Sequence, residues 1–392
     1  MIKSYTINIK EIDDEEFALE ELEAQVKDIT LLKNTIGIVS THIDYIHSGV
    51  YAAVCDALPF TPVGGTTIFT ATTDGMSTFV LSIMVLTSDD CEFSFAVSDA
   101  IPEKDGLAKV AGDCYKKALA GLSAEPKLAF AFSLFGTTHF TDEYVAGMNA
   151  INDSAPIFGT LTIAEEDSQF TPGKLLLGKD AYENHMAIVA VCGDISPKFY
   201  MASVSTDGII SPDVGIVTKS EHNRVYEVNN MSSLEFFTKI GYYVSDFDKG
   251  SQSTNILMHL KNENGEVVSS WAGDVYAHAY GVGMFNAIVP EGTVLSIFSI
   301  TSDEIMKTAK DVVSRIKENH TDGTILMYTC ASRQFTLLSE DPAKEYNYLR
   351  GELGDSHTFL AAASGGEMCP SSPTDDTFYN KGHSFTLVAC VL

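Results

Sequence analysis

The chain has 392 residues, of which 45% are hydrophobic, and its 25 basic and 53 acidic side chains give a formal charge of −28. This length predicts two domains, or one large domain, with a substantial core. The negative field disfavours binding to nucleic acid or to an anionic membrane. No apolar run reaches the ~20 residues that a membrane-spanning helix needs, and the N-terminal segment turns acidic where a signal peptide would be apolar. We therefore expect a cytoplasmic protein without membrane insertion.

Helices and strands alternate along the first half of the sequence. The acidic run 11–25 has partial helical spacing in Phe17, Leu19 and Leu22, which predicts a surface helix with one buried stripe. The next elements, in order, are strand "TIGIVST", helix "DYIHSGVYAAVCDAL", strands "PVGGTTI", "STFVLSIMVLTS" and "EFSFAVSD", helix "EKDGLAKVAGDCYKKALAGL", strand "KLAFAFSLFGTTHF", helix "TDEYVAGMNAIND", and strands "APIFGTLTIAEED" and "HMAIVAVC".

The second half repeats this alternation. Its predicted elements, in order, are strand "NRVYEVNN", helix "SLEFFTKIGYYV", a hairpin of "TNILMHLKN" and "GEVVSSWAG", strand "TVLSIFSI", helix "SDEIMKTAKDVVSRIKEN", strand "GTILMYTCASRQF" ending in a polar turn, helix "DPAKEYNYLRGELG", strand "HTFLAAASGGEMCPSSP" with a Gly-rich turn, and strand "HSFTLVAC". Gly354 is a candidate helix stop.

The strands "HMAIVAVC" and "HSFTLVAC" share a pattern, a histidine and a cysteine separated by six mostly apolar residues. Residues seven apart in a strand lie on opposite faces and roughly 23 Å apart, so neither segment can hold one metal ion between its two ends. The pattern indicates one structural element used twice. We predict an α/β fold of two pseudo-repeated domains with mixed sheets, packed as a layered sandwich. The Gly- and Pro-containing segment 204–220 suggests domains at 1–210 and 211–392.

Seven cysteines are dispersed along the chain without any C-x-x-C, which argues against a zinc knuckle and for free thiols. No set of residues indicates a metal site.

Polar and glycine-rich turns follow four predicted strands. Ligand crevices of α/β proteins lie at the carboxyl ends of strands, where glycines let a ligand approach the backbone and threonines offer hydroxyls. The candidate ligand-binding residues in the first half are Gly64, Gly65, Thr66, Thr67, Gly159 and Thr160. None of these turns is a G-x-G-x-x-G motif or a P-loop, so each is also consistent with a simple turn.

The turns "TCASR" and "SGGE" carry the strongest candidates. Arg333 offers a donor fork suited to a carboxylate, and Glu367 could accept from an ammonium group. Cys330, Gly365 and Gly366 complete this predicted site. Such a pair would suit an amino-acid-like ligand. The same residues are also consistent with a structural Arg–Glu pair beside a small buried cysteine.

These residues resemble a known family. "YTCASR", "ASGGE" and the terminal "HSFTLVA" are similar to the FIST C domain, whose pattern is a Cys-x-x-Arg turn, a Gly-Glu turn and a final His-Asn-x-Thr strand. His383 and Thr386 match this strand, whereas Ser384 stands where the family has Asn. "PVGGTTIF", "APIFGTLTIAEED" and "TKSEHNRVYEVNNMSSLEFFTKIG" resemble the FIST N domain and its junction with FIST C.

The resemblance implies a bacterial sensory module that binds small molecules such as amino acids and acts in signal transduction. His383 joins the ligand-binding candidates on this ground. No output domain is seen, so we expect a separate signalling partner. The resemblance also implies haem in some members, with His139, His185 and His278 as candidate axial ligands, although no C-x-x-C-H is present. A third hypothesis is an enzyme with Cys330 as nucleophile and His357 or His383 as base. The sensor is the preferred hypothesis, without a cofactor and without enzymatic activity.

Overall fold

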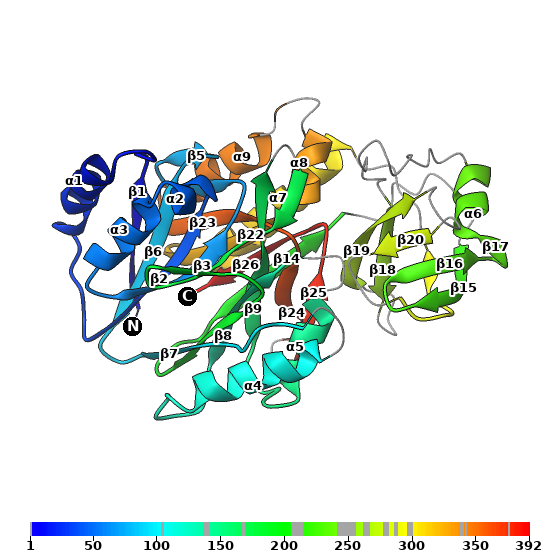
Figure 1. Cartoon of the computed structure of the whole chain (residues 1–392), viewed down its shortest axis with the longest axis horizontal. Helices are drawn as coiled ribbons and strands as arrows, with labels where there is room; N and C mark the ends of the chain where they lie inside the picture. The colour runs from blue at the N-terminus through cyan, green and yellow to red at the C-terminus, as the bar shows by residue number, and fades with distance from the viewer. Residues whose placement is uncertain are drawn as a thin grey trace.

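The computed structural model describes residues 2–102, 106–135, 141–166, 169–204, 215–240, 256–261, 267–276, 282–285, 289–295, 301–337, 341, 343–374 and 377–392. These residues form helices, three mixed sheets and one antiparallel sheet, so the predicted α/β class is confirmed. Three sheets build the main body, and the fourth lies in a lobe beside it (Figure 1).

The main body contains the same succession of elements three times. Each copy has a strand, a helix, a second strand, one or two further helices, a third strand parallel to the second, a hairpin and a last strand. The first repeat comprises β1 (Lys3–Ile9), α1 (Glu15–Val26), β2 (Asn34–Thr41), α2 (Asp44–His47), α3 (Val50–Ala57), β3 (Thr61–Thr66), the hairpin β4 (Thr70–Thr72) and β5 (Gly75–Ser77), and β6 (Leu81–Ser88). The second comprises β7 (Glu92–Val97), α4 (Leu107–Leu119), β8 (Leu128–Leu134), α5 (Thr141–Asn149), β9 (Ile157–Glu166), β10 (Gln169–Pro172), the hairpin β11 (Leu175–Leu177) and β12 (Asp180–Tyr182), and β13 (Ala187–Cys192).

The third repeat is interrupted after its first strand by the lobe. It comprises β14 (Lys198–Ser203), α7 (Ser302–Asn319), β22 (Gly323–Cys330), α8 (Ala331–Leu337), α9 (Lys344–Leu353), β23 (His357–Ser364), the hairpin β24 (Glu367–Thr374) and β25 (Thr377–His383), and β26 (Thr386–Val391). The lobe comprises β15 (Gly215–Glu221), β16 (Arg224–Val228), β17 (Met231–Ser232), α6 (Ser233–Lys239), β18 (Ile256–Lys261), β19 (Val267–Tyr276), β20 (Val282–Phe285) and β21 (Val294–Leu295).

All three body sheets have the same strand order. From the hairpin edge to the opposite edge, the first sheet is β12-β11-β3-β2-β6-β1, the second is β25-β24-β9-β8-β13-β7 and the third is β5-β4-β23-β22-β26-β14. In each sheet the two central strands are parallel and their neighbours are antiparallel. Each repeat sends its hairpin into another repeat's sheet: β4–β5 joins the third, β24–β25 the second and β11–β12 the first.

An equivalent backbone hydrogen bond is found at each of the three places where a hairpin enters another repeat's sheet. The amides of Thr66, Leu161 and Ala363 donate to the carbonyls of Lys174, Gly366 and Phe69, at 3.0, 2.8 and 3.1 Å. The structure thus shows a third copy of the unit that the sequence pattern indicated twice. The strands "HMAIVAVC" and "HSFTLVAC" contain β13 and β26, which occupy equivalent places in their sheets, and β6 is the third equivalent.

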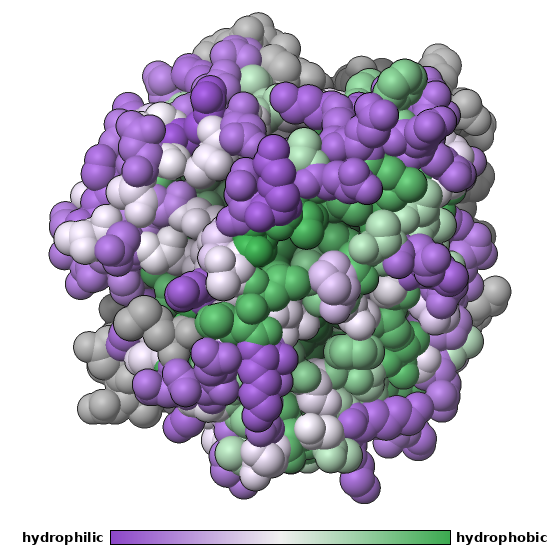
Figure 2. Space-filling view, turned by 90° about the vertical axis from the view of Figure 1, so that its left-hand side faces the viewer, coloured by the Kyte–Doolittle hydropathy of each residue, from purple (hydrophilic) through white to green (hydrophobic). Residues whose placement is uncertain are grey.

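The inner faces of the three sheets share one apolar core, which includes Ile38, Phe130 and Leu326. Their outer faces are covered by helices: α1 and α3 on the first sheet, α4 and α5 on the second, α7 and α9 on the third. On the end face shown in Figure 2, apolar residues gather in the middle with polar residues around them. The sequence division at residue 210 stays a prediction; the second and third sheets each take strands from both sides of it.

Two glycines test how closely the strands are packed. A Cβ atom on Gly64 would lie 1.9 Å from the carbonyl oxygen of Val39, whereas one on Gly351, in α9, would meet no atom within 4 Å. We expect Gly64→Ala to destabilise the protein by more than about 2 kcal/mol through overpacking. The matched Gly351→Ala change should stabilise it by about 0.5–1 kcal/mol through helix propensity. Thermal denaturation would measure both, and equal effects would contradict this account of the close approach.

Candidate functional site

The predicted site residues of the second half meet at the carboxyl ends of β22 and β23. These strands are parallel, with Cys330 opposite Ser364. The sequence predicted a polar turn after Cys330, but helix α8 begins directly at Ala331, so Arg333 lies in its first turn. The turn was wrongly expected because "CASRQF" has no helical capping signal. The side chain of Arg333 is fully buried.

Arg333 is paired with a carboxylate that the sequence motifs do not single out. Its Nη2 atom donates to Glu345 of α9, to the hydroxyl of Thr308 at 2.7 Å and to the carbonyl of Ile305 at 3.4 Å. The other oxygen of Glu345 accepts a hydrogen bond from Thr329 at 3.0 Å. Arg333 Nε and Nη1 are buried and have no hydrogen-bond partner among the described residues. The Nη2 donor is therefore satisfied, and Nε and Nη1 have no partner in the described part of the chain.

Glu367 and His383 form a second part of the cluster. They begin β24 and end β25, lie directly opposite each other across the hairpin, and are both fully buried. Glu367 Oε2 accepts from the hydroxyl of Thr386 at 2.6 Å, while its Oε1 has no partner among the described residues. His383 Nε2 lies 3.1 Å from the carbonyl of Cys369, which can only accept. The proton is thus on Nε2, and Nδ1 presents a free lone pair.

Burial controls the charge of both groups. Desolvation raises the pKa of the Glu367 carboxyl to about 8, against a smaller opposing effect of the Thr386 hydrogen bond. Desolvation also lowers the pKa of His383 to about 4. At neutral pH Glu367 is mostly a carboxylic acid and His383 is a neutral imidazole, so this pair carries almost no net charge.

The repeated architecture shows that the fold does not require these ionisable groups. Thr160, Glu367 and His383 form one row across the second sheet. The corresponding row of the first sheet is Gly65, Leu175 and Tyr182, and that of the third is Ala362, Thr70 and Ser77. Two of the three sheets therefore close without a carboxyl group or an imidazole in this row. A buried acid and histidine are costly at a place where the architecture does without them, which points to a functional role.

Cys330 is buried beside this cluster. Desolvation, and then the charge of Glu367, raise the pKa of its thiol to about 12, so it is a protonated thiol at neutral pH. All seven cysteines are free and buried.

The predicted glycines and threonines contact protein atoms. A Cβ on Gly65 would lie 2.0 Å from Thr162, one on Gly159 2.0 Å from the Ala131 carbonyl, and one on Gly365 2.5 Å from Ile163. For Gly366 the nearest atom would be 3.0 Å away, in Thr141. These close approaches explain the glycines by packing, and ligand contact there stays a prediction.

The threonine hydroxyls help to join the repeats. Thr66 donates to the Ile163 carbonyl at 3.0 Å and Thr67 to the Ala363 carbonyl at 2.8 Å. Thr160 donates to the Ser364 hydroxyl at 2.8 Å. Ser364 lies in the "SGGE" turn but was not among the predicted site residues. No motif indicated Thr308 or Glu345, because only the packing of separate segments brings them to this cluster.

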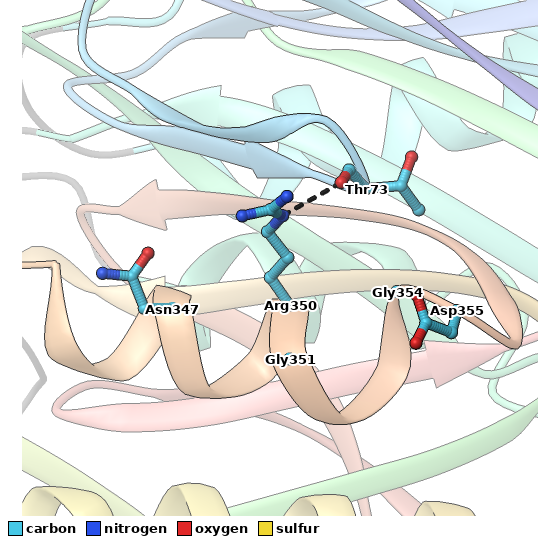
Figure 3. Close-up of a pocket in the computed structure, with 6 residues that line it drawn as sticks. All are labelled: Thr73, Asn347, Arg350, Gly351, Gly354 and Asp355. Atoms are coloured by element: carbon cyan, nitrogen blue, oxygen red, sulfur yellow. Dashed lines mark hydrogen bonds between the residues drawn. The ribbon is translucent and has the colours of Figure 1, made fainter.

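An open cavity lies elsewhere, between α9 and the turn that joins β4 to β5. It measures about 420 Å³, and its lining residues are Thr73, Asn347, Arg350, Gly351, Gly354 and Asp355 (Figure 3). None of the predicted ligand-binding residues lines it, although Gly354, the predicted helix stop, does.

The histidines proposed as haem ligands lie in separate places. His139 and His278 lie outside the described residues, and His185 stands just before β13 with its Nδ1 atom against the carbonyl of Glu183. In the described part of the chain, no group of three His, Cys, Asp or Glu side chains is suited to a metal ion. No described helix is long and apolar enough to cross a membrane.

The fold and this cluster define a mixed α/β protein with a buried polar site in its third repeat. The chain belongs to the FIST family: the FIST N domain model matches residues 35–231 and the FIST C domain model matches residues 244–370. FIST domains are sensory domains of signal transduction that bind small ligands.

No curated protein matches the chain. Among solved structures, a cyanuric acid hydrolase from A. caulinodans is similar over 100% of this chain and 99% of its own, at 10% identity and a TM-score of 0.36. A second cyanuric acid hydrolase, described as an evolutionary innovation by structural concatenation, is similar over the same shares, at 10% identity and a TM-score of 0.35. Likeness at this level carries no argument about activity.

The buried ion pair makes a prediction about stability. Glu345→Gln leaves the Arg333 charge buried without its carboxylate, so we expect a loss of about 3–5 kcal/mol of unfolding free energy. Replacing both residues by methionine removes the pair without stranding a charge and should cost less than the single change. Urea denaturation would measure both variants, and a double variant less stable than Glu345→Gln would contradict the assignment.

Glu367 predicts a pH dependence. Because its pKa is raised on folding, the folded state binds more protons than the unfolded state between about pH 5 and pH 8. Its contribution to stability is therefore complete at low pH and is lost as pH rises toward 8. The Glu367→Gln variant should show a flatter stability profile than wild type over this range, as measured by the melting temperature. Parallel profiles would show that Glu367 ionises normally.

Proposed function

We propose that this chain is a sensor for an amino acid or a similar small zwitterion, which it holds at the buried cluster of Arg333, Glu367 and His383. The observation that carries the proposal is the set of buried polar atoms without partners among the described residues: Arg333 Nε and Nη1, Glu367 Oε1 and His383 Nδ1. Unpaired buried polar groups are costly, and a ligand that supplies the partners recovers this cost.

The charges of the cluster favour a ligand without net charge. Arg333 is balanced by Glu345, and Glu367 and His383 are largely neutral at pH 7. A ligand carboxylate would accept from the free Arg333 donors, and a ligand ammonium would pair with Glu367 Oε1. Each ligand group then meets a buried atom that lacks a partner, whereas a simple anion would leave Glu367 Oε1 without one and a simple cation would leave Arg333 Nε and Nη1 without one among the described residues.

The connections of the cluster offer a route for the signal. Arg333 contacts Ile305 and Thr308 in the first turns of α7, the helix that follows the lobe. Ile305 also packs with Val204, which follows β14, and with Leu337 of α8 and Phe385. The two points where the lobe leaves and rejoins the body therefore lie in one apolar cluster beside the site.

A ligand that shifts Arg333 would change how the lobe is held, and β19 of the lobe also contacts β25, the strand of His383. Because the site is fully buried, access needs movement of these segments. We propose that a separate signalling partner reads the resulting position of the lobe.

We also propose that the chain is not an enzyme that uses Cys330 as nucleophile. A thiol with a pKa near 12 supplies almost no thiolate at neutral pH. A thiol reagent that labelled Cys330 faster than the other cysteines would overturn this part of the proposal.

The ligand is tested by isothermal titration with a panel of amino acids at pH 7. An ammonium group favours the ionised form of Glu367, so binding should release a proton. Titration in two buffers of different ionisation enthalpy measures that release, and affinity should rise between about pH 6 and pH 8.

The matched control is Glu367→Gln, which keeps the shape of the side chain but should bind without releasing a proton. If no amino acid binds, or if the variant releases as many protons as wild type, the proposed ligand site is wrong.

A further inference from the structure

The junction between a hairpin turn and the neighbouring helix occurs in comparable form in the first and third sheets. In the first sheet, the turn of Gly178 and Lys179 meets α3. The hydroxyl of Tyr51 donates to the Gly178 carbonyl at 2.6 Å, and Lys179 Nζ lies 2.8 Å from a carboxylate oxygen of Asp56. A hydrogen bond and an ion pair therefore close this junction.

The third sheet presents the same junction with different residues. Its turn is Thr73 and Asp74, which corresponds to Gly178 and Lys179 because both are two-residue turns at the same register. Arg350 takes the place of the Tyr51 phenol, since its Nε atom donates to the Thr73 carbonyl at 3.0 Å.

The acidic partner is also present in the third sheet. Asp355 follows Arg350 by five residues, as Asp56 follows Tyr51, and both aspartates stand close to the hairpin turn.

An ion pair to the aspartate is what the third sheet lacks: Arg350 is a cation at this junction, but its Nε atom donates to the Thr73 carbonyl, and no ion pair joins it to Asp355 among the described residues. The place of Lys179 is taken by Asp74, whose carboxylate accepts from the side-chain amide of Asn8 at 2.7 Å. Asp355 has no ion-pair partner among the described residues. Where the first sheet joins a lysine to an aspartate, the third sheet has two acidic side chains and no ammonium between them in the described part of the chain.

The 420 Å³ cavity lies at this same junction. Gly351 and Gly354 follow Arg350 with the spacing that puts Ala52 and Cys55 after Tyr51, and a Cβ atom on Gly351 would meet nothing within 4 Å. In Figure 3 Arg350 extends toward Thr73, and Asp355 lies beyond Gly354, past the end of the helix. Gly351 leaves room for an aliphatic chain near an aspartate that has no ion-pair partner among the described residues, whereas a Cβ atom on Gly354 would lie 2.7 Å from the carbonyl oxygen of Arg350.

We propose that this cavity binds the primary ammonium group of an aliphatic amine, which pairs with Asp355 as Lys179 pairs with Asp56. The carboxyl end of α9 adds a partial negative charge at the same place. The overall charge of −28 further concentrates small cations around the molecule. Arg350 holds the hairpin turn through its hydrogen bond to the Thr73 carbonyl, as Tyr51 holds the turn of the first sheet. The proposal does not depend on the buried cluster or on its ligand.

The probe is 1,5-diaminopentane, whose binding is followed by saturation-transfer difference NMR, a method suited to weak ligands. We expect binding to the wild-type protein at low salt and weaker binding at high salt. Asp355→Asn should weaken binding by up to about fivefold, in the range of an exposed ion pair. Gly351→Leu should abolish binding by filling the cavity.

Two further variants separate this site from general attraction to an acidic protein. Asp56→Asn is the matched control: its carboxylate already has a cation, so binding of the diamine should be unchanged. Asp74→Lys supplies a cation at the position of Lys179 and should abolish binding. Asp74→Asn, which supplies none, should keep it.

A neutral analogue and a lysine derivative complete the test. 1,5-Pentanediol should not bind, because it lacks the ammonium. Tighter binding of Nα-acetyl-lysine amide than of the diamine would identify a protein side chain as the natural source of the ammonium, and the reverse order would identify a free amine. Equal binding of diol and diamine, or unchanged binding in Asp355→Asn, would overturn the proposal.

Discussion

The structure depends on the exchange of hairpins among three sheets. Each repeat ends its parallel strand pair with a hairpin that completes another repeat's sheet, and the backbone bonds of Thr66, Leu161 and Ala363 join the chain at each crossing. No sheet of the body is complete without a strand from another repeat. Because all three inner faces share one apolar core, the body is expected to fold as a single cooperative unit in which local packing errors are felt across repeats. The close packing also explains why glycine is required at positions where an added Cβ atom would lie about 2 Å from an atom of a neighbouring segment.

The threefold repetition also separates architecture from function. Equivalent positions in the three sheets have the same structural role, so a difference in residue type among them needs a reason other than the fold. Glu367 and His383 stand where the first sheet has Leu175 and Tyr182, and Asp74 stands where it has Lys179. The first departure lies in the hairpin of the third repeat and places ionisable groups in the interior. The second lies in the hairpin that the first repeat adds to the third sheet, next to a surface cavity lined mostly by residues of the third repeat. The lobe is inserted in the third repeat as well, so this repeat carries the features that the other two do not need.

The buried cluster of Arg333, Glu367 and His383 and the surface cavity beside α9 differ in their electrostatics. The inner cluster is fully buried, and desolvation there keeps Glu367 protonated and His383 neutral, so its chemistry is one of compensated charge. The outer cavity is open to solvent and is governed by the negative field of the whole molecule. A buried site can discriminate strongly because an unpaired group in it is costly, whereas an open one is weaker and more sensitive to salt.

The sequence by itself determined the α/β class, most helices and strands, the equivalence of the segments in β13 and β26, and the family, because each depends on local periodicity or on short motifs. It also placed Arg333, Glu367 and His383 near strand ends, where they lie. Only the tertiary structure decided that the repeat occurs three times, since the first strand of the third copy is separated from the rest by the lobe and the third equivalent strand, β6, lacks the His–Cys pattern. It alone decided that Arg333 pairs with Glu345, and that the end of α9 and the β4–β5 turn line an open cavity. Those choices depend on which distant segments pack against each other, and the sequence spacing of a residue carries no information about its partner across a core.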